Sequence, residues 1–194
     1  MEREIILTGI GGQGIQLMAK VLAQAAAAEG QQVMLFDMYG GAMRGSASES
    51  TIVIGDQEIS APPIIPHCWS LIAMHPASLA SLALKLRPNG QLFLNETLVH
   101  ENPRPEVAST AIPATRLAEQ AGNLMGAGMI MLGGFIAATQ LVPLSSLVAA
   151  MRESLPPHRQ PLADKNVQLL NVGVDYIRGS PSNESRVTSH ESRQ

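Results

Sequence analysis

The run of glycines at residues 9–14 constrains the fold of this chain more than any other feature. It reads Gly-Ile-Gly-Gly-Gln-Gly and matches the pattern G-x-G-x-x-G. An apolar stretch at 4–8 precedes it and a helical pattern at 15–29 follows, which predicts a strand, a tight turn and a helix. In such a turn Gly9 permits the sharp change of direction, Gly11 lets a ligand or another backbone approach, and Gly14 lets the helix pack on the sheet. The helix N-terminus then presents unpaired N–H groups to the loop, which favours an anion.

A second apolar strand is expected at 32–36, and it ends at Asp37. In dinucleotide-binding folds an acid about 20 residues beyond the glycines binds the ribose hydroxyls, and Asp37 lies 23 residues after Gly14. Two interpretations stay open from these residues. The first is a nucleotide or phosphate site that includes Asp37. The second is a glycine turn required only for tight packing, with Asp37 as an ordinary acid at a strand end.

The rest of the chain alternates between strand and helix patterns. Strands are expected at 51–54, 70–74, 91–95 and 107–112, and helices at 77–86, 114–121, 124–138, 144–155 and 162–177. A turn at 55–57 with a return at 58–60 predicts a hairpin. Together these patterns predict an α/β fold, a Rossmann-like three-layer α/β/α domain with a largely parallel sheet and an inserted β-hairpin. We expect one domain over residues 1–178 and a disordered polar tail over residues 179–194.

Three segments follow predicted strands and should meet at the carboxyl edge of the sheet, where α/β folds bind ligands. They are residues 9–14, residues 37–45 and the dipeptide at 75–76. Arg44 either reaches a carboxylate or phosphate from this edge or is a solvated loop residue. His75 either titrates near neutral pH within a site or bonds to the backbone at a strand end. From residue type alone we favour the second interpretation in both cases.

Composition excludes several classes of function. Cys68 is the single cysteine, so the chain forms no internal disulfide, no C-x-x-C zinc site and no conventional iron–sulfur cluster of its own. A net charge of −3 and 3% aromatic residues argue against nucleic acid as a partner. The chain has no apolar run of membrane length and begins without a signal-peptide pattern, which predicts no membrane span and a cytoplasmic location. His67 and Cys68 should point apart in an extended segment, and we identify no catalytic constellation.

The glycine run and a second loop together resemble a known family, the gamma subunit of 2-oxoacid:ferredoxin oxidoreductases. That family shows G-x-G-G-Q-G, then Y-G-x-E-x-R-G-G and then I-x-S-P. Here these motifs correspond to residues 9–14, 39–46 and 58–62, the last of which reads Glu-Ile-Ser-Ala-Pro. Residues 118–123, 131–133 and 165–166 also look like the family, and the resemblance covers about residues 4–178.

Four positions depart from the family pattern. Ala42 stands where the family has an acid, and Ser46 replaces the second glycine of R-G-G. His75 stands where asparagine is frequent, and residues 127–128 lie where another asparagine is common. These departures leave the fold prediction intact and bear on which 2-oxoacid the chain serves.

The resemblance implies an oxidoreductase in which other chains perform the chemistry. Alpha and beta subunits hold thiamine diphosphate and magnesium and decarboxylate a 2-oxoacid. Iron–sulfur clusters, with a ferredoxin-like subunit, pass electrons to ferredoxin, and coenzyme A takes the acyl group. This chain is then an assembly subunit that binds no cofactor alone and lines the coenzyme A path, and the isolated chain can form a homodimer. The residues expected at this interface or cofactor path are Gly9, Gly11, Gly12, Gln13, Gly14, Asp37, Tyr39, Arg44, Gly45 and His75.

Two other functions stay open at this stage. The chain could be a freestanding NAD(P)-binding Rossmann oxidoreductase with Asp37 on the ribose, which predicts direct nicotinamide binding. It could also be a small-ligand or scaffold domain with no redox partner. The sequence does not distinguish pyruvate, 2-oxoglutarate, branched-chain and aryl 2-oxoacids as substrates of the complex.

Overall fold

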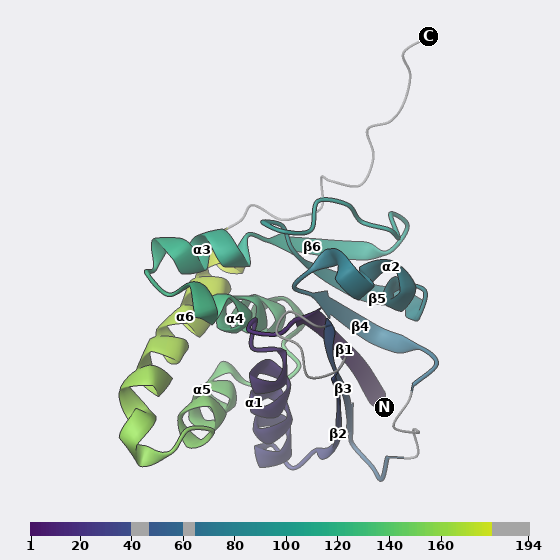
Figure 1. The fold of residues 1–194 in the computed structure, drawn as a ribbon. Coiled ribbons are helices and arrows are strands. Elements are labelled where there is room, and N and C mark those ends of the chain that lie inside the picture. The colour runs from purple at the N-terminus through teal and green to yellow at the C-terminus, as the bar shows by residue number, and fades with distance from the viewer. Residues whose placement is uncertain (40–46, 60–64, 180–194) are drawn as a thin grey trace.

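The structure is a computed structural model that describes residues 1–39, 47–59 and 65–179 of the chain. Its described residues form one six-stranded sheet in the order β2-β3-β1-β4-β5-β6 (Figure 1). The strands are β1 (Glu2–Ile10), β2 (Gln32–Tyr39), β3 (Ala47–Gly55), β4 (Cys68–Ala73), β5 (Leu86–Asn95) and β6 (Ala108–Ile112). β1, β4, β5 and β6 run parallel, and β3 is antiparallel to both of its neighbours. The predicted α/β fold with a mostly parallel sheet is therefore confirmed.

β3 is an internal strand of the sheet and not one arm of the predicted hairpin. β3 lies between β1 and β2, whereas residues 56–59 form no strand and Ser60 falls outside the described residues. The physical reason is the apolar run Ile52-Val53-Ile54, which is buried on both faces of the sheet, as expected of an internal strand. β1 and β2 consequently do not pair with each other, although α1 connects them.

The segment after β4 also differs from the expected helix at 77–86. It contains a 3-10 turn, η1 (Pro76–Ser78), and a short helix, α2 (Leu79–Ala83). β5 then begins at Leu86, the last residue of the expected helix, and passes through Pro88. Proline offers no N–H to a sheet, and here the register shifts: Cys68 pairs with Leu86 but Ser70 pairs with Gln91.

The other helices lie close to their predicted ranges. They are α1 (Ile15–Ala28), α3 (Ala114–Gln120), α5 (Leu144–Glu153) and α6 (Gln160–Gly179). The predicted helix at 124–138 divides into a 3-10 turn, η2 (Leu124–Gly126), and α4 (Ala127–Thr139), and another 3-10 turn, η3 (Pro157–Arg159), precedes α6. Gly179 ends α6 and so lies in a helix rather than in the predicted tail, whose other residues, 180–194, fall outside the described residues. No described helix has both the length and the apolar character needed to cross a bilayer.

Helices cover the two faces of the sheet unequally. α1, α4, α5 and α6 lie on one side of the sheet (Figure 1). Ile5, Leu7 and Phe93 belong to the larger core on that face. The opposite face is covered by α2 and the segment that follows β5, over Ile6 and Leu71. This alternation of inward residues follows from the two-residue period of a strand. It leaves the carboxyl ends of β1, β4 and β5 at one edge, between the two layers.

α4 is the central helix of the larger layer, and every residue from Ala127 to Ile136 is buried. It crosses α6 at two glycines. A Cβ at Gly133 would lie 2.0 Å from the carbonyl oxygen of Leu170, and one at Gly173 would lie 1.9 Å from that of Ile130. The two backbones therefore touch at this crossing, which fixes α4 and with it the position of its N-terminus.

Candidate functional site

The glycine run forms the predicted strand–turn–helix connection. β1 ends at Ile10 and α1 begins at Ile15, with Gly14 as its N-cap. Gly12 and Gly14 have φ angles of 101° and 77°, which L residues rarely adopt. A Cβ at Gly14 would meet no atom within 4 Å, so this glycine supplies a backbone conformation and not the helix–sheet packing expected of it. Gly11 and Gly12 are exposed, and their backbone faces outward.

Gln13 holds the loop in this conformation. Its Oε1 accepts a hydrogen bond from the backbone N–H of Ile10 at 2.9 Å, and its Nε2 donates to the carbonyl of Met74 at 3.2 Å. Gly9 makes this possible, because a Cβ there would lie 2.5 Å from Gln13 Oε1. Gly9 therefore leaves space for the Gln13 side chain at the end of β1.

Asn95 extends this hydrogen-bond network across the edge and was not identified from the sequence. It is fully buried at the end of β5, and its Nδ2 donates to the Met74 carbonyl at 3.2 Å and to Thr115 Oγ1 at 2.8 Å. Its Oδ1 accepts from the backbone N–H of Thr115 at 3.2 Å. The Met74 carbonyl thus joins Gln13 and Asn95, and the network ties the glycine loop to β4, β5 and α3. The sequence feature that could have identified Asn95 is its position as an amide residue at the end of a predicted strand.

The N-terminus of α4 packs directly on the glycine loop. A Cβ at Gly128 would lie 2.8 Å from the Gln13 carbonyl oxygen and 2.9 Å from Met18 Sδ. The turn just before this helix, η2, carries two exposed apolar side chains, Leu124 at 55% and Met125 at 69% exposure. The two exposed apolar side chains therefore lie three and four residues before Gly128, the residue through which α4 contacts the glycine loop. Such a combination is typical of a surface that a partner covers.

His75 lies at the same edge, directly after the Met74 carbonyl. Its backbone is extended, and its Nδ1 accepts a hydrogen bond from the N–H of Ala77 at 3.2 Å, which caps η1. In a neutral ring this contact leaves the proton on Nε2. This is the backbone contact that we favoured for His75 from its residue type. A role of His75 toward a cofactor stays a prediction.

Asp37 and its neighbours lie farther from the glycine loop. Because β3 separates β2 from β1, Asp37 sits two strands away, about 10 Å in the direction of the sheet hydrogen bonds. Its Oδ1 accepts a hydrogen bond from Ser50 Oγ at 2.5 Å. This arrangement does not favour the dinucleotide interpretation, in which the acid-bearing strand adjoins the first strand. Tyr39 ends β2, whereas Arg44 and Gly45 fall outside the described residues.

Two buried or half-buried ionisable groups have shifted pKa values. Burial raises the pKa of the Cys68 thiol to about 12, with the nearby Glu4 carboxylate adding to the effect. Burial also raises the pKa of Glu49, and Lys85 partly opposes that shift. Among the described residues no three His, Cys, Asp or Glu side chains gather as metal ligands would. A thiol with this pKa is not an activated nucleophile at neutral pH.

Known proteins resemble this chain over about nine-tenths of its length. A family model for pyruvate ferredoxin/flavodoxin oxidoreductase matches residues 4–176. The 2-oxoglutarate synthase subunit KorC of Methanothermobacter marburgensis is 32% identical over 186 residues, which cover 91% of this chain and 97% of that protein. The ketoisovalerate oxidoreductase subunit VorA of the same organism is 27% identical, and the match covers 91% of this chain but 37% of VorA.

Solved structures agree with these matches. The gamma subunit of a keto/oxoacid ferredoxin oxidoreductase from Geobacter sulfurreducens aligns with a TM-score of 0.80 at 25% identity, covering 92% of this chain and 98% of that one. A 2-oxoglutarate:ferredoxin oxidoreductase chain from Magnetococcus marinus has the same fold, with a TM-score of 0.81 at 14% identity, and 32% of it is covered. On these grounds the chain belongs to the pyruvate ferredoxin/flavodoxin oxidoreductase family, as a member of the gamma-subunit type.

Proposed function

We propose that this chain is the gamma subunit of a complex that oxidatively decarboxylates 2-oxoglutarate with coenzyme A and ferredoxin. The observation that carries the substrate is the similarity to KorC, a 2-oxoglutarate synthase subunit, at 32% identity over 97% of its length, compared with 28% identity to the indolepyruvate oxidoreductase subunit IorB over 96% of its length. VorA, the ketoisovalerate relative, is matched over only part of its length. In the complex, thiamine diphosphate with magnesium supplies the decarboxylation chemistry and iron–sulfur clusters carry the electrons. We assign these groups to other chains, because one cysteine cannot hold a conventional cluster.

The part of this chain that we assign to assembly is its carboxyl edge. Gln13 and Asn95 fix the glycine loop from within, so the exposed backbone of Gly11 and Gly12 is held rigid before any partner binds. Leu124 and Met125 add apolar surface beside it. Preorganised backbone and apolar anchors are the features that make a small surface bind well. We infer that the thiamine-binding subunits dock here, with the path of coenzyme A along the same edge.

The substrate assignment is tested by co-expressing this chain with its thiamine-binding and ferredoxin-like partner subunits under anaerobic conditions. The purified complex is then assayed for coenzyme A-dependent reduction of viologen. We expect 2-oxoglutarate to be the best substrate when it is compared with pyruvate, ketoisovalerate and indolepyruvate. A clear preference for any of the other three would refute the assignment.

The docking edge is tested with substitutions that leave the core intact. Met125→Asp places a charge on the apolar surface, and Gly11→Trp covers exposed backbone. We expect both variants to fold but to lose assembly and activity. Leu84→Asp is the matched control, because Leu84 is 73% exposed at the end of α2, next to the amino end of β5 and away from this edge. Equal loss in all three variants, or loss in none, would contradict the assignment.

A further inference from the structure

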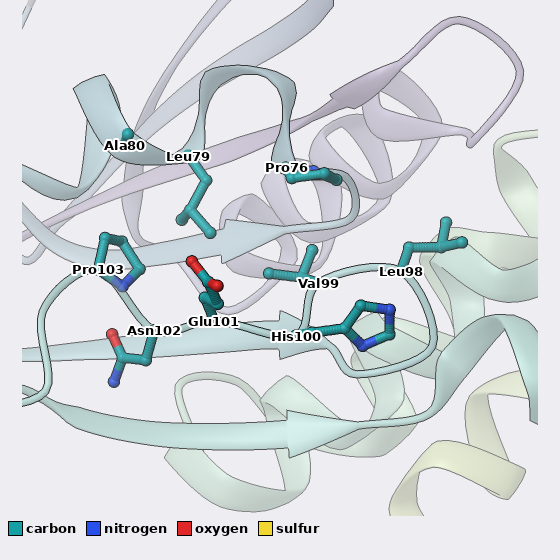
Figure 2. Close-up of a pocket in the computed structure, with 9 residues that line it drawn as sticks. All are labelled: Pro76, Leu79, Ala80, Leu98, Val99, His100, Glu101, Asn102 and Pro103. Carbon is teal, nitrogen blue, oxygen red and sulfur yellow. The ribbon is translucent and has the colours of Figure 1, made fainter.

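A concave site lies on the α2 face of the sheet. It is a cavity of about 360 Å³ between η1, the start of α2 and residues 98–103, which form the segment that follows β5 (Figure 2). Leu79 and Val99 are buried beneath it, with 5% and 4% exposure, while Pro76, Ala80 and Pro103 contribute further apolar surface. This volume is at the small end of ligand sites and has room for one large side chain rather than a dinucleotide.

Glu101 gives this apolar pocket a negative charge. Figure 2 shows its side chain extending toward Leu79, across the space between the segment and α2. Its carboxylate forms no hydrogen bond or ion pair with any other residue that the structure describes. None of the nine lining residues is Lys or Arg. Phosphates and other anions would therefore be repelled, whereas a cation would find an unpaired acceptor above an apolar floor.

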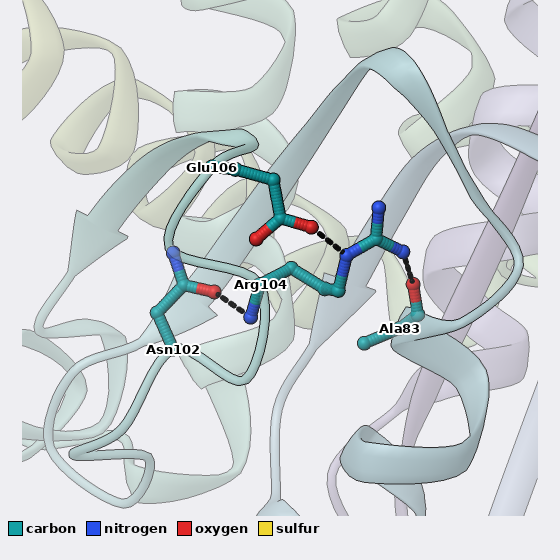
Figure 3. A network of polar contacts seen from close by, with 4 residues as sticks. All are labelled: Ala83, Asn102, Arg104 and Glu106. Carbon is teal, nitrogen blue, oxygen red and sulfur yellow. Dashed lines mark hydrogen bonds and ion pairs between the residues drawn. The ribbon is translucent and has the colours of Figure 1, made fainter.

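The pocket wall is held in place before anything binds. Figure 3 shows Arg104 donating to the Ala83 carbonyl, at 2.9 Å, and pairing with Glu106. The backbone N–H of Arg104 donates to Asn102 Oδ1 at 2.8 Å, and the pairing with Arg104 lowers the pKa of Glu106. At the other end of the segment, the N–H of Val99 donates to the Asn95 carbonyl at 2.9 Å. Arg104 thus ties the segment to α2, and its ion-pair partner is Glu106 and not Glu101.

We propose that this pocket receives an arginine or lysine side chain of a partner subunit in the complex. The aliphatic stem would lie on Leu79 and Val99, and the charged head would bind Glu101, which is how long basic side chains divide between apolar and polar surroundings. The proposal rests on the proposed function. A protein occupant is supported by VorA and the Magnetococcus marinus chain, in which a region like this chain makes up about a third of a longer polypeptide and so has a covalently joined protein neighbour.

The test measures the affinity of this chain for its purified thiamine-binding subunits. Glu101→Gln should raise Kd about tenfold. This increase lies between the small effect of losing an exposed ion pair and the large effect of losing a desolvated one. Ala80→Trp, at an exposed position on the pocket rim, should raise Kd similarly by filling the cavity. Glu153→Gln is the matched control, since Glu153 is an exposed acid on α5, in the layer on the other face of the sheet, and should leave Kd unchanged. A photo-cross-linking residue at position 98, on the rim, should attach to a peptide of the partner that contains Arg or Lys.

The possible failures are distinguishable. If the unmodified chain binds no thiamine-binding subunit, the proposed function is wrong and this proposal with it. If the unmodified chain binds but Glu101→Gln and Ala80→Trp bind equally well, only the pocket proposal is overturned. N-acetylarginine amide serves as a small-molecule probe of the isolated chain. If it binds as strongly as the partner subunits do, and no cross-link to protein forms, the pocket is a site for a small cation instead.

Discussion

Gly9→Ala tests the reasoning about the glycine loop most sharply. A Cβ at this position would lie 2.5 Å from Gln13 Oε1 and 2.8 Å from Ile15 Cδ1, closer than real Cβ contacts. Both atoms are ends of flexible side chains, so the least costly response is rotation of the Gln13 side chain out of the loop. That movement breaks its hydrogen bonds with the Ile10 N–H and the Met74 carbonyl.

The expected cost follows from those two bonds. Each contributes a net of about 0.5–1.5 kcal/mol, for about 1–3 kcal/mol together. Replacing glycine by alanine recovers about 0.4–1 kcal/mol by restricting the unfolded chain. We therefore expect Gly9→Ala to lower the free energy of unfolding by about 0–2.6 kcal/mol, with a central value of about 1.3 kcal/mol. Gln13→Ala removes the same bonds without a clash and should cost about 1–3 kcal/mol.

Urea denaturation of both single variants and of the double variant Gly9→Ala/Gln13→Ala measures the coupling. Since both substitutions remove the same bonds, the double variant should cost less than the sum of the two single variants, and its excess over Gln13→Ala measures the remaining contact of the new Cβ with Ile15. The dependence on urea should be unchanged. Strict additivity of the two costs would refute the account of why Gly9 is required.

Four further predictions concern the scaffold. Gly133→Ala should cost about 2 kcal/mol or more in urea denaturation, because its Cβ would meet the Leu170 carbonyl, whereas Gly179→Ala, in open space, should be neutral or slightly stabilising. Asn95→Ala should cost about 2–4 kcal/mol by the same assay, because it leaves buried polar groups of the network unpaired. Burial raises the pKa of Cys68 from an ordinary 9.0 to about 12, so iodoacetamide at pH 8 should alkylate the native thiol about a thousandfold more slowly than the unfolded one. The folded state also holds this thiol proton more tightly, so the thiol's contribution to stability should be complete below pH 9.0 and decline toward pH 12; Cys68→Ala should remove this decline.

Local patterns predicted those parts of the fold that depend on neighbours in sequence. The strand–turn–helix at residues 9–14 follows from glycines that adopt positive φ between two apolar segments. The helices α1, α3, α5 and α6 follow from helical spacing of apolar residues. The family resemblance rested on two linked motifs, and the matches over residues 4–176 confirm it.

The features that the sequence did not reveal depend on pairing between distant residues. β3 pairs with β1 and β2 at once, and nothing in its local pattern distinguishes an internal antiparallel strand from one half of a hairpin. Asn95 acts through Met74 and Thr115, which lie about 20 residues away on either side and meet only when the sheet forms. Asp37 fulfilled the spacing of a ribose-binding acid, yet the inserted strand moves it away from the glycine loop.

The most direct test of the central claim is an anaerobic affinity purification of this chain from its native host at low salt, with mass spectrometry and a viologen assay on the eluate. The account predicts recovery of thiamine-binding subunits and coenzyme A-dependent oxidation of 2-oxoglutarate. Recovery of this chain alone, inactive with every 2-oxoacid and able to bind NAD or NADP, would contradict it.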